Sequence, residues 1–211
     1  MAKKKYKISV IFLLAIVCPL LGGHAFAQQA NIDAGVAYLR FTQNPDGSWG
    51  GTVTSLNTTF QTTATTARTL QLLGITDATL TNALGFLSAQ SPDTVDDLAH
   101  QVDVLAASGG DVSSLVAEVK AVQQDNGGWG IDLKKVFVSD VADSLSALLA
   151  LRAAGAADTN IVSKALGFLL GSQNTDGGWG AAPGHPSEVF YTALTLLALK
   201  DFQTTFGLSA F

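Results

Sequence analysis

The sequence predicts an all-α protein built as an array of helical hairpins. A motif centred on Gly-Trp occurs three times, and segments rich in Ala and Leu flank each copy with apolar residues at steps of three and four. No apolar–polar alternation of useful length indicates strands. Hydrophobic residues make up 47% of the 211 residues and charged residues 14%, which is enough apolar material for a core and too little charge for a disordered chain.

The repeated motif reads Gln-x-x-[Asp/Asn]-Gly-[Ser/Gly]-Trp-Gly and contains all three tryptophans of the chain. Its copies are residues 43–50, 123–130 and 173–180. Each copy follows a helical pattern and precedes a polar loop that leads into a second helix. Such repetition is typical of a stacked array, because one helical pair cannot bury its apolar faces alone.

Each unit is expected to contain two helices joined by the motif. The helices before the motif glutamines are predicted at residues 32–41, 112–122 and 161–170. The second helices are predicted at residues 62–73, 97–107, 140–154 and 188–199. Three of them are expected to end at glycines, which take the left-handed C-cap conformation without steric cost: Gly74, Gly109 and Gly155. Helix starts are expected to be capped by Asp77, Asp111, Asp158, Ser139-Asp140 and Ser187-Glu188.

Four units are expected, and the second is degenerate. Residues 83–90 repeat the pattern of residues 165–173, yet no Gly-Trp follows Gln90. The stretch from Gln90 to the predicted cap Gly109 is also shorter than the equivalent stretch from Gln43 to Gly74. We therefore expect this unit to lack the motif loop.

Residues 1–27 are predicted to be a signal peptide. Four lysines precede an apolar run over residues 8–21, and Ala25-Phe26-Ala27 supplies the small residues that a signal peptidase reads. We expect an exported protein, periplasmic or secreted, whose mature domain is residues 28–211 and does not span a membrane. Processing removes the only cysteine and four of the 12 Lys and Arg, leaving 8 against 17 Asp and Glu. This excludes thiolate chemistry and disfavours nucleic-acid binding.

The motif between paired helices resembles that of the squalene cyclase and prenyltransferase repeat superfamily, over nearly the whole of residues 28–211. Members of that superfamily form α/α toroids. With about four hairpins, the resemblance implies an open arc of the α/α-toroid type and not a closed ring. It also implies that the motif glutamine and tryptophan are structural, with the amide bonding to neighbouring helix ends. That role falls on Gln43, Trp49, Gln123, Trp129, Gln173 and Trp179. Alternatively, the indoles form a surface for a sugar or lipid.

The sequence lacks the motif residues of three activities found in the superfamily that it resembles. The segment Asp93-Thr-Val-Asp96-Asp97 only approximates the Asp-x-Asp-Asp acid motif of the alkene-protonating cyclases. The zinc site of the protein prenyltransferases and the thioester motif of related domains both require a cysteine, which the mature chain does not have. Asp96 and His100 are spaced for one helix face, but no third ligand accompanies them, so neither a metal nor another cofactor is expected.

Candidate binding residues come from aligning the second helices on their glycine caps. Thr62, Asp97, Asp143 and Tyr191 are then equivalent and are expected near the mouth of a concave face, with Thr66, Gln101, Ala147 and Thr195 one turn deeper. A polar rim over an Ala/Leu wall suits a small amphipathic or glycan ligand, whereas polar first-turn residues are also common helix caps. His185, in the loop before the last helix, is a further candidate, either catalytic or at the surface.

Two functions are therefore open. The first is an exported, non-catalytic module that binds a hydrophobic, glycan or protein ligand. The second is an enzyme of the terpene cyclase or polysaccharide lyase type, or a fragment of one, that uses Asp97 or Asp143. The apolar segment 202–211 lies where a repeat array needs a polar end. This predicts self-association through an open C-terminal edge, or further repeats in a longer chain.

Overall fold

The computed structural model describes residues 28–51 and 58–206. The predicted signal peptide lies outside these residues, and so do residues 207–211 of the predicted C-terminal edge. The chain divides into two compact units, the first ending at Gln43 and the second beginning at Asn44. In the described part of the first unit, residues 28–42 form a helix.

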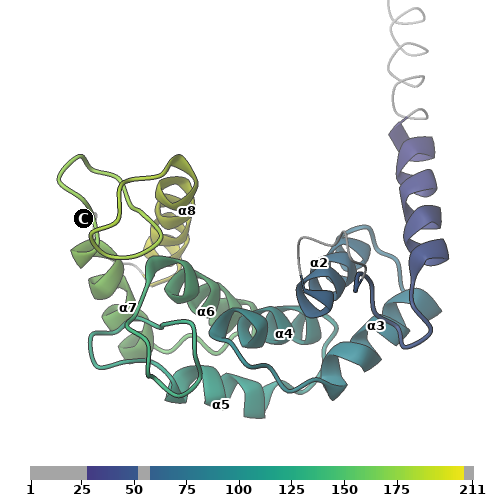
Figure 1. Ribbon diagram of the computed structural model, residues 1–211, viewed down its shortest axis with the longest axis horizontal. Helices are drawn as coiled ribbons and strands as arrows, with labels where there is room; N and C mark the ends of the chain where they lie inside the picture. Colours follow the sequence, from purple (N-terminus) through teal and green to yellow (C-terminus); the bar gives the residue numbers. More distant parts are fainter. Residues whose placement is uncertain (1–27, 52–57, 207–211) are drawn as a thin grey trace, which may run out of the picture. The chain divides into compact units, whose positions relative to one another are not determined.

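The second unit is a succession of helices (Figure 1). They are α2 (Thr59–Leu72), α3 (Ala78–Ala89), α4 (Val95–Ala107), α5 (Ser113–Ala121), α6 (Val141–Ala153), α7 (Thr159–Gly171) and α8 (Val189–Phe206). Extended pairing in the described residues is confined to two isolated bridges, Thr94 with Asp132 and Trp129 with Asp140. The all-α prediction is confirmed. None of the described helices combines the length and apolar character needed to cross a membrane.

Glycines and short polar side chains cap the ends of the helices. The three predicted glycines have the left-handed φ expected after a helix: Gly74 (+70°), Gly109 (+74°) and Gly155 (+64°). At the helix starts, the side chains of Asp77, Asp140 and Asp158 accept backbone N–H bonds from the first turns of α3, α6 and α7. Two further caps, Thr58 of α2 and Thr94 of α4, were not among the sequence predictions.

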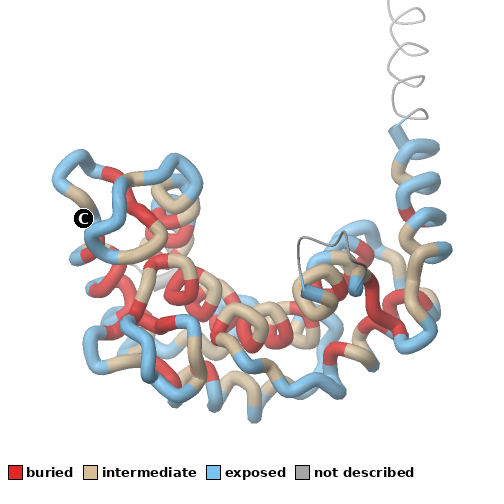
Figure 2. Tube along the Cα trace, in the orientation of Figure 1, coloured by how far each residue is buried: buried red, intermediate tan, exposed pale blue. Residues whose placement is uncertain are grey.

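The helices of the second unit form two rows (Figure 1). In the even-numbered row, α4 packs on α2, α6 on α4 and α8 on α6. In the odd-numbered row, α3 lies against α2 and α4, α5 against α4 and α6, and α7 against α6 and α8. Each odd-numbered helix therefore contacts two consecutive helices of the other row. The buried residues lie mainly where the helices pack against one another (Figure 2).

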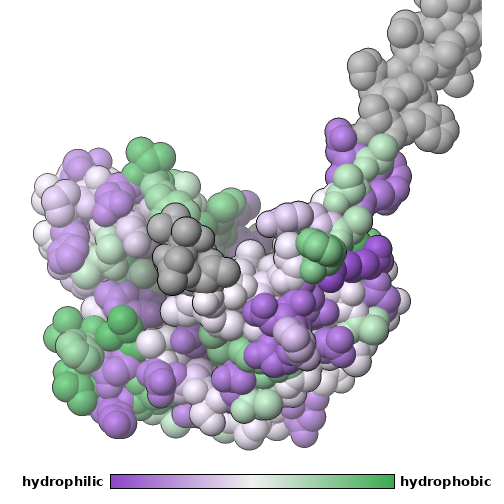
Figure 3. Space-filling model, turned by 45° about the vertical axis from the view of Figure 1, so that its right-hand side comes forward, coloured by the Kyte–Doolittle hydropathy of each residue, from purple (hydrophilic) through white to green (hydrophobic). Residues whose placement is uncertain are grey.

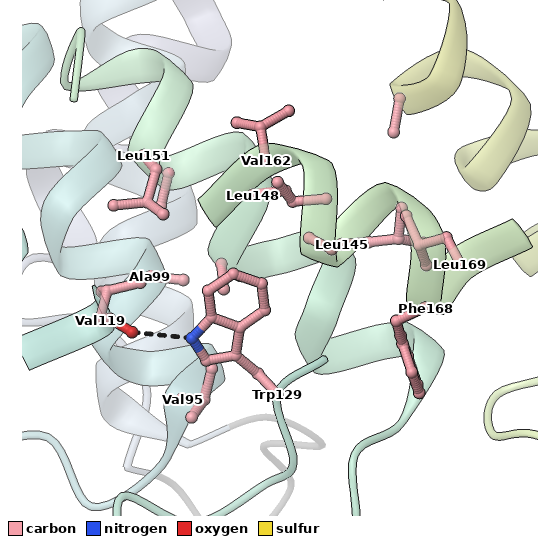
Figure 4. Packing of buried hydrophobic residues seen from close by; sticks show 14 of the residues in the cluster. Val95, Ala99, Val119, Trp129, Leu145, Leu148, Leu151, Val162, Phe168 and Leu169 are labelled. Atoms are coloured by element: carbon pink, nitrogen blue, oxygen red, sulfur yellow. Dashed lines mark hydrogen bonds between the residues drawn. The ribbon is translucent and has the colours of Figure 1, made fainter. Parts of the chain in front are cut away.

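The main hydrophobic core lies between the rows. The Trp129 side chain packs against two helices of the even-numbered row, contacting a cluster that includes Val95 of α4 and Leu148 of α6 (Figure 4). Trp179 belongs to the same cluster. Small residues such as Ala147 are fully buried and allow helices to approach closely. The packing of each hairpin thus depends on the hairpin that follows it.

Candidate functional site

The second motif loop joins two helices through its tryptophan. The Trp129 side chain is completely buried, and its Nε1 donates to the carbonyl oxygen of Val119 in α5 at 2.7 Å (Figure 4). The backbone N–H of Trp129 donates to the hydroxyl of Ser144 in α6 at 2.9 Å. Because both donors are buried, these bonds satisfy groups that would otherwise cost about 1–3 kcal/mol each.

The third motif has the same contacts at the equivalent positions. Trp179 Nε1 donates to the carbonyl of Leu169 in α7 at 2.7 Å, and the backbone N–H of Trp179 donates to Thr192 Oγ1 in α8 at 2.9 Å. In the first motif, the backbone N–H of Trp49 donates to Thr63 Oγ1 of α2 at 3.0 Å. Both indoles are almost fully buried.

The motif glutamine bonds within its own loop and to the next hairpin. Gln123 Nε2 donates to the carbonyl of Gly127 at 2.8 Å and to that of Ile161 in α7 at 3.0 Å. Gln173 Nε2 donates to the carbonyl of Gly177 at 2.8 Å. Gln43 is the last residue of the first unit.

The degenerate unit replaces its missing indole with an amide. Gln101 of α4 is 1% exposed, and its Nε2 donates to the carbonyls of Leu87 at 2.6 Å and Gln90 at 3.1 Å. Leu87 holds the position in α3 that Leu169 holds in α7, as the shared Ala-Leu-Gly-Phe-Leu sequence shows. Gln101 therefore occupies the acceptor that the tryptophan N–H takes in the third unit.

A hydroxyl in the even-numbered row accompanies each tryptophan. Thr63, Ser144 and Thr192 accept from the tryptophan backbone N–H groups, and each lies one residue after the predicted rim residue of its helix. The degenerate unit, which has no tryptophan, carries the fully buried Leu98 at this position. This substitution pattern was readable from the sequence and was missed.

A groove of about 730 Å³ lies on α2, α4 and α6. Its floor is formed by small and apolar side chains: Ala99, Ala107, Leu149, Ala150 and Ala153. Its polar lining consists of Arg68, His100, Asp103, Ser146 and Arg152. We call this the α2–α4–α6 groove. It combines convergent polar groups with an apolar floor, as small-ligand sites do.

Ion pairs hold the charged groups of the groove in place. Arg68 Nε lies 3.1 Å from Asp103 Oδ2, which links α2 to α4. Arg152 pairs through Nη1 with the carboxylate of Asp201 in α8. These side chains are partly exposed, so the pairs add little stability and leave further donors and acceptors for a ligand.

His100 is oriented by the first turn of α4. Its Nδ1 lies 2.9 Å from the carbonyl oxygen of Asp96 and 3.5 Å from Asp96 Oδ2. Both neighbours are acceptors, so Nδ1 carries a proton and Nε2 remains for other partners. The other Asp96 oxygen accepts from Ser146 Oγ at 3.0 Å, which ties α4 to α6 beside the groove.

The predicted acids Asp97 and Asp143 lie in the first turns of α4 and α6 and are not among the groove-lining residues. The Asp143 side chain is buried, and burial raises its pKa to about 8, with smaller contributions from the hydrogen bond to Asp140 and the charge of Asp96. Burial, followed by the charge of Asp96, also raises the pKa of Asp97, whose buried Oδ1 has no hydrogen-bond partner in the described part of the chain. The negative charge of Asp96 thus helps to raise the pKa of both candidate acids.

The remaining candidates are more dispersed. Thr62 donates its hydroxyl to the carbonyl of Thr58 and thereby reinforces the start of α2. Tyr191 is half-buried and packs edge-on against Phe190, with ring centroids 5.2 Å apart. His185 is exposed in the loop before α8, where its carbonyl accepts from Asn174 Nδ2 at 2.8 Å. None of the three is among the groove-lining residues. In the described part of the chain, no three acidic, His or Cys side chains converge as a metal site requires.

Comparison with known proteins adds no assignment to this geometry: no family model matches the chain, and no curated protein is significantly similar to it.

Proposed function

We propose that this chain is an exported repeat module of the squalene cyclase and prenyltransferase type, and that it binds a neutral glycan in the α2–α4–α6 groove. The observation that carries the binding proposal is the gathering of guanidinium, imidazole, carboxylate and hydroxyl groups over an alanine-rich floor. The repeat assignment is supported by the motif loops, whose indoles are buried and hydrogen-bonded to helix carbonyls. Export is proposed from residues 1–27.

The chemistry of the lining favours a neutral, polyhydroxylated ligand. A sugar hydroxyl both donates and accepts, and the groove offers Arg68 as donor and Asp103 as acceptor in one pair. Ser146 and His100 add groups that do both. The carboxylates of Asp103 and Asp201 neutralise Arg68 and Arg152, which disfavours an acidic polysaccharide. The alanine floor leaves room for the C–H face of a sugar ring.

Calorimetric titration with neutral oligosaccharides, and with oligouronates for comparison, tests the glycan proposal. Arg68→Met and Asp103→Asn should each weaken binding of a neutral oligosaccharide by about tenfold, because each removes a charged hydrogen-bonding group. Lys164→Met on the odd-numbered helix α7 is the matched control and should bind like the wild type. If both groove variants keep wild-type affinity, or if no neutral oligosaccharide binds, the glycan assignment is wrong.

Acid catalysis by Asp143 is a second candidate function. A buried carboxyl that is protonated at neutral pH beside other carboxyls is what protonation of an alkene requires, and Asp143 has this property. Asp143 precedes the groove residue Ser146 by one turn of α6. Product formation from a polyprenyl substrate, retained in Arg68→Met and lost in Asp143→Asn, would favour catalysis. Absence of turnover would leave binding as the function.

A further inference from the structure

The last hairpin exposes apolar side chains that the earlier hairpins bury. Val95, Val141 and Val189 are the first residues of α4, α6 and α8. The first two are 0% exposed, whereas Val189 is 89% exposed. Two turns further along the same face of each helix, Val102 and Leu148 are 0% exposed, whereas the equivalent Leu196 is 54% exposed. The same residue types therefore lie in a core in two units and at a surface in the third.

The backbone shows the same difference. The N–H of Val95 donates to the carbonyl of Ile131 at 2.9 Å, and that of Val141 donates to the carbonyl of Ala181 at 2.9 Å. Both acceptors immediately follow a motif, so each loop closes over the preceding even-numbered helix. Among the described residues, the N–H of Val189 has no such acceptor.

The motif glycines identify what covers the earlier units. A Cβ on Gly47 would lie 2.3 Å from the carbonyl oxygen of Asn82 in α3, and one on Gly127 would lie 2.2 Å from that of Lys164 in α7. Gly177 has a similar φ of +86°, yet within the described residues no atom beyond its chain neighbours lies within 4 Å of its Cβ position. An odd-numbered helix thus covers the first two motifs and leaves the third open.

These open positions form one surface. A hollow of about 450 Å³ is lined by Gly177, Gly178, Val189, Ala193 and Leu196, together with Asp176, Ser187, Glu188 and Thr192. We call it the α8 edge. Hydrophobic side chains are visible at this end of the molecule in Figure 3. The internal repeat defines what fits here: a helix of the same type as α3 and α7.

The helix over residues 28–42 has the required residues. Counted from the motif glutamine, Tyr38 is equivalent to Phe168 of α7, and Ala34 to Lys164. The Phe168 ring packs on the second motif, where a Cβ on Gly128 would lie 2.8 Å from its Cδ1. Phe168 is 9% exposed in that position, whereas Tyr38 is 66% exposed. At Gly178, the equivalent of Gly128, the three atoms nearest to the Cβ position instead belong to Ser187 and Thr192.

We propose that the α8 edge of one molecule binds the helix of residues 28–42 of a second copy, head to tail. Tyr38 of the second copy then packs on Gly178, and its helix covers Gly177 as α7 covers Gly127. The contact buries Val189 and Leu196, the residues that the repeat otherwise keeps in its core. Because each molecule has one donor helix and one acceptor edge, repetition of the contact produces a ring or a filament.

Sedimentation analysis of the purified protein over a wide concentration range tests this assembly. The wild type should associate reversibly, and Val189→Asp and Tyr38→Asp should each weaken association by about tenfold or more, since each places a charge in an apolar contact. Val136→Asp, which alters a valine 76% exposed in the loop after the second motif, is the matched control and should associate like the wild type. Leu196→Asp is a second edge variant if circular dichroism shows that Val189→Asp loses helix.

Mixing the two variants separates the head-to-tail contact from other modes. Each variant keeps one intact surface, so an equimolar mixture should form a one-to-one dimer and nothing larger. A wild type that remains monomeric throughout would overturn the proposal. Wild-type association by Tyr38→Asp would also overturn it, because the α8 edges would then be pairing with each other.

Discussion

Trp129→Phe is the substitution that most sharply measures the contribution of a motif loop to stability. It keeps an aromatic ring in the core but removes the hydrogen bond to the carbonyl of Val119, which measures 2.7 Å. Leaving a buried carbonyl unpaired costs about 1–3 kcal/mol. The smaller ring leaves a void of roughly 40 Å³, which adds ~1 kcal/mol. We therefore expect a loss of ~2–4 kcal/mol in the free energy of unfolding.

Urea unfolding followed by circular dichroism gives this quantity directly. Phe137→Leu is the control, because Phe137 is an exposed aromatic in the loop after the same motif, 60% exposed, and should change stability by less than ~0.5 kcal/mol. A loss of under ~1 kcal/mol in Trp129→Phe would refute the structural role of the indole N–H. Such a result would favour the alternative that the tryptophans serve a ligand.

Three further substitutions test separate parts of the fold. Gly127→Ala should destabilise the protein far more than Gly177→Ala in thermal unfolding, because both have positive φ but only the first places a Cβ 2.2 Å from the Lys164 carbonyl oxygen. Gln101→Leu should lower the free energy of unfolding by ~1–3 kcal/mol, since the carbonyl of Gln90 loses its donor and that of Leu87 keeps only the N–H of Gln90. Asp143→Asn should raise the melting temperature at pH 8 and change it little near pH 4.

The sign of the pH effect follows from where the proton is bound. The Asp143 pKa is 3.8 in the unfolded reference and about 8 in the folded protein. Between these values the folded state holds a proton that the unfolded state has released, so wild-type stability falls as pH rises, by at most ~1.4 kcal/mol per pH unit. The variant should lack this decline. Parallel pH profiles for the two proteins would contradict the burial of an acid at this site, and equal losses for the two glycine variants would contradict the clash with α7.

The elements of the fold were predictable because their signals are local. Glycine at positions 74, 109 and 155 requires only the left-handed conformation of its own residue, and aspartate caps act within one turn. The motif spacing likewise identified the hairpins. The role of Gln101 was not predictable by spacing, because an amide that reaches a helix end from α4 has no fixed offset from the loop it replaces.

The α2–α4–α6 groove was not predictable, because it depends on contacts between segments far apart in the sequence. Arg68, His100 and Arg152 lie on three different helices, and their convergence depends on how closely α2, α4 and α6 pack. That packing is set by the alanines in the floor and by the motif loops, which no single segment encodes. Alignment on the glycine caps instead predicts a site at the first turns of the helices, where Asp143 is buried.

Hydrogen exchange at three equivalent amides tests most directly whether each motif loop closes over the preceding hairpin and leaves the last one open. The N–H groups of Val95 and Val141 should exchange slowly, because each is bonded to a loop carbonyl. The N–H of Val189 should exchange rapidly in dilute solution and more slowly as concentration rises and the α8 edge is covered. Slow exchange of Val189 in dilute solution, or rapid exchange of Val95 and Val141, would contradict this structure of coupled repeats.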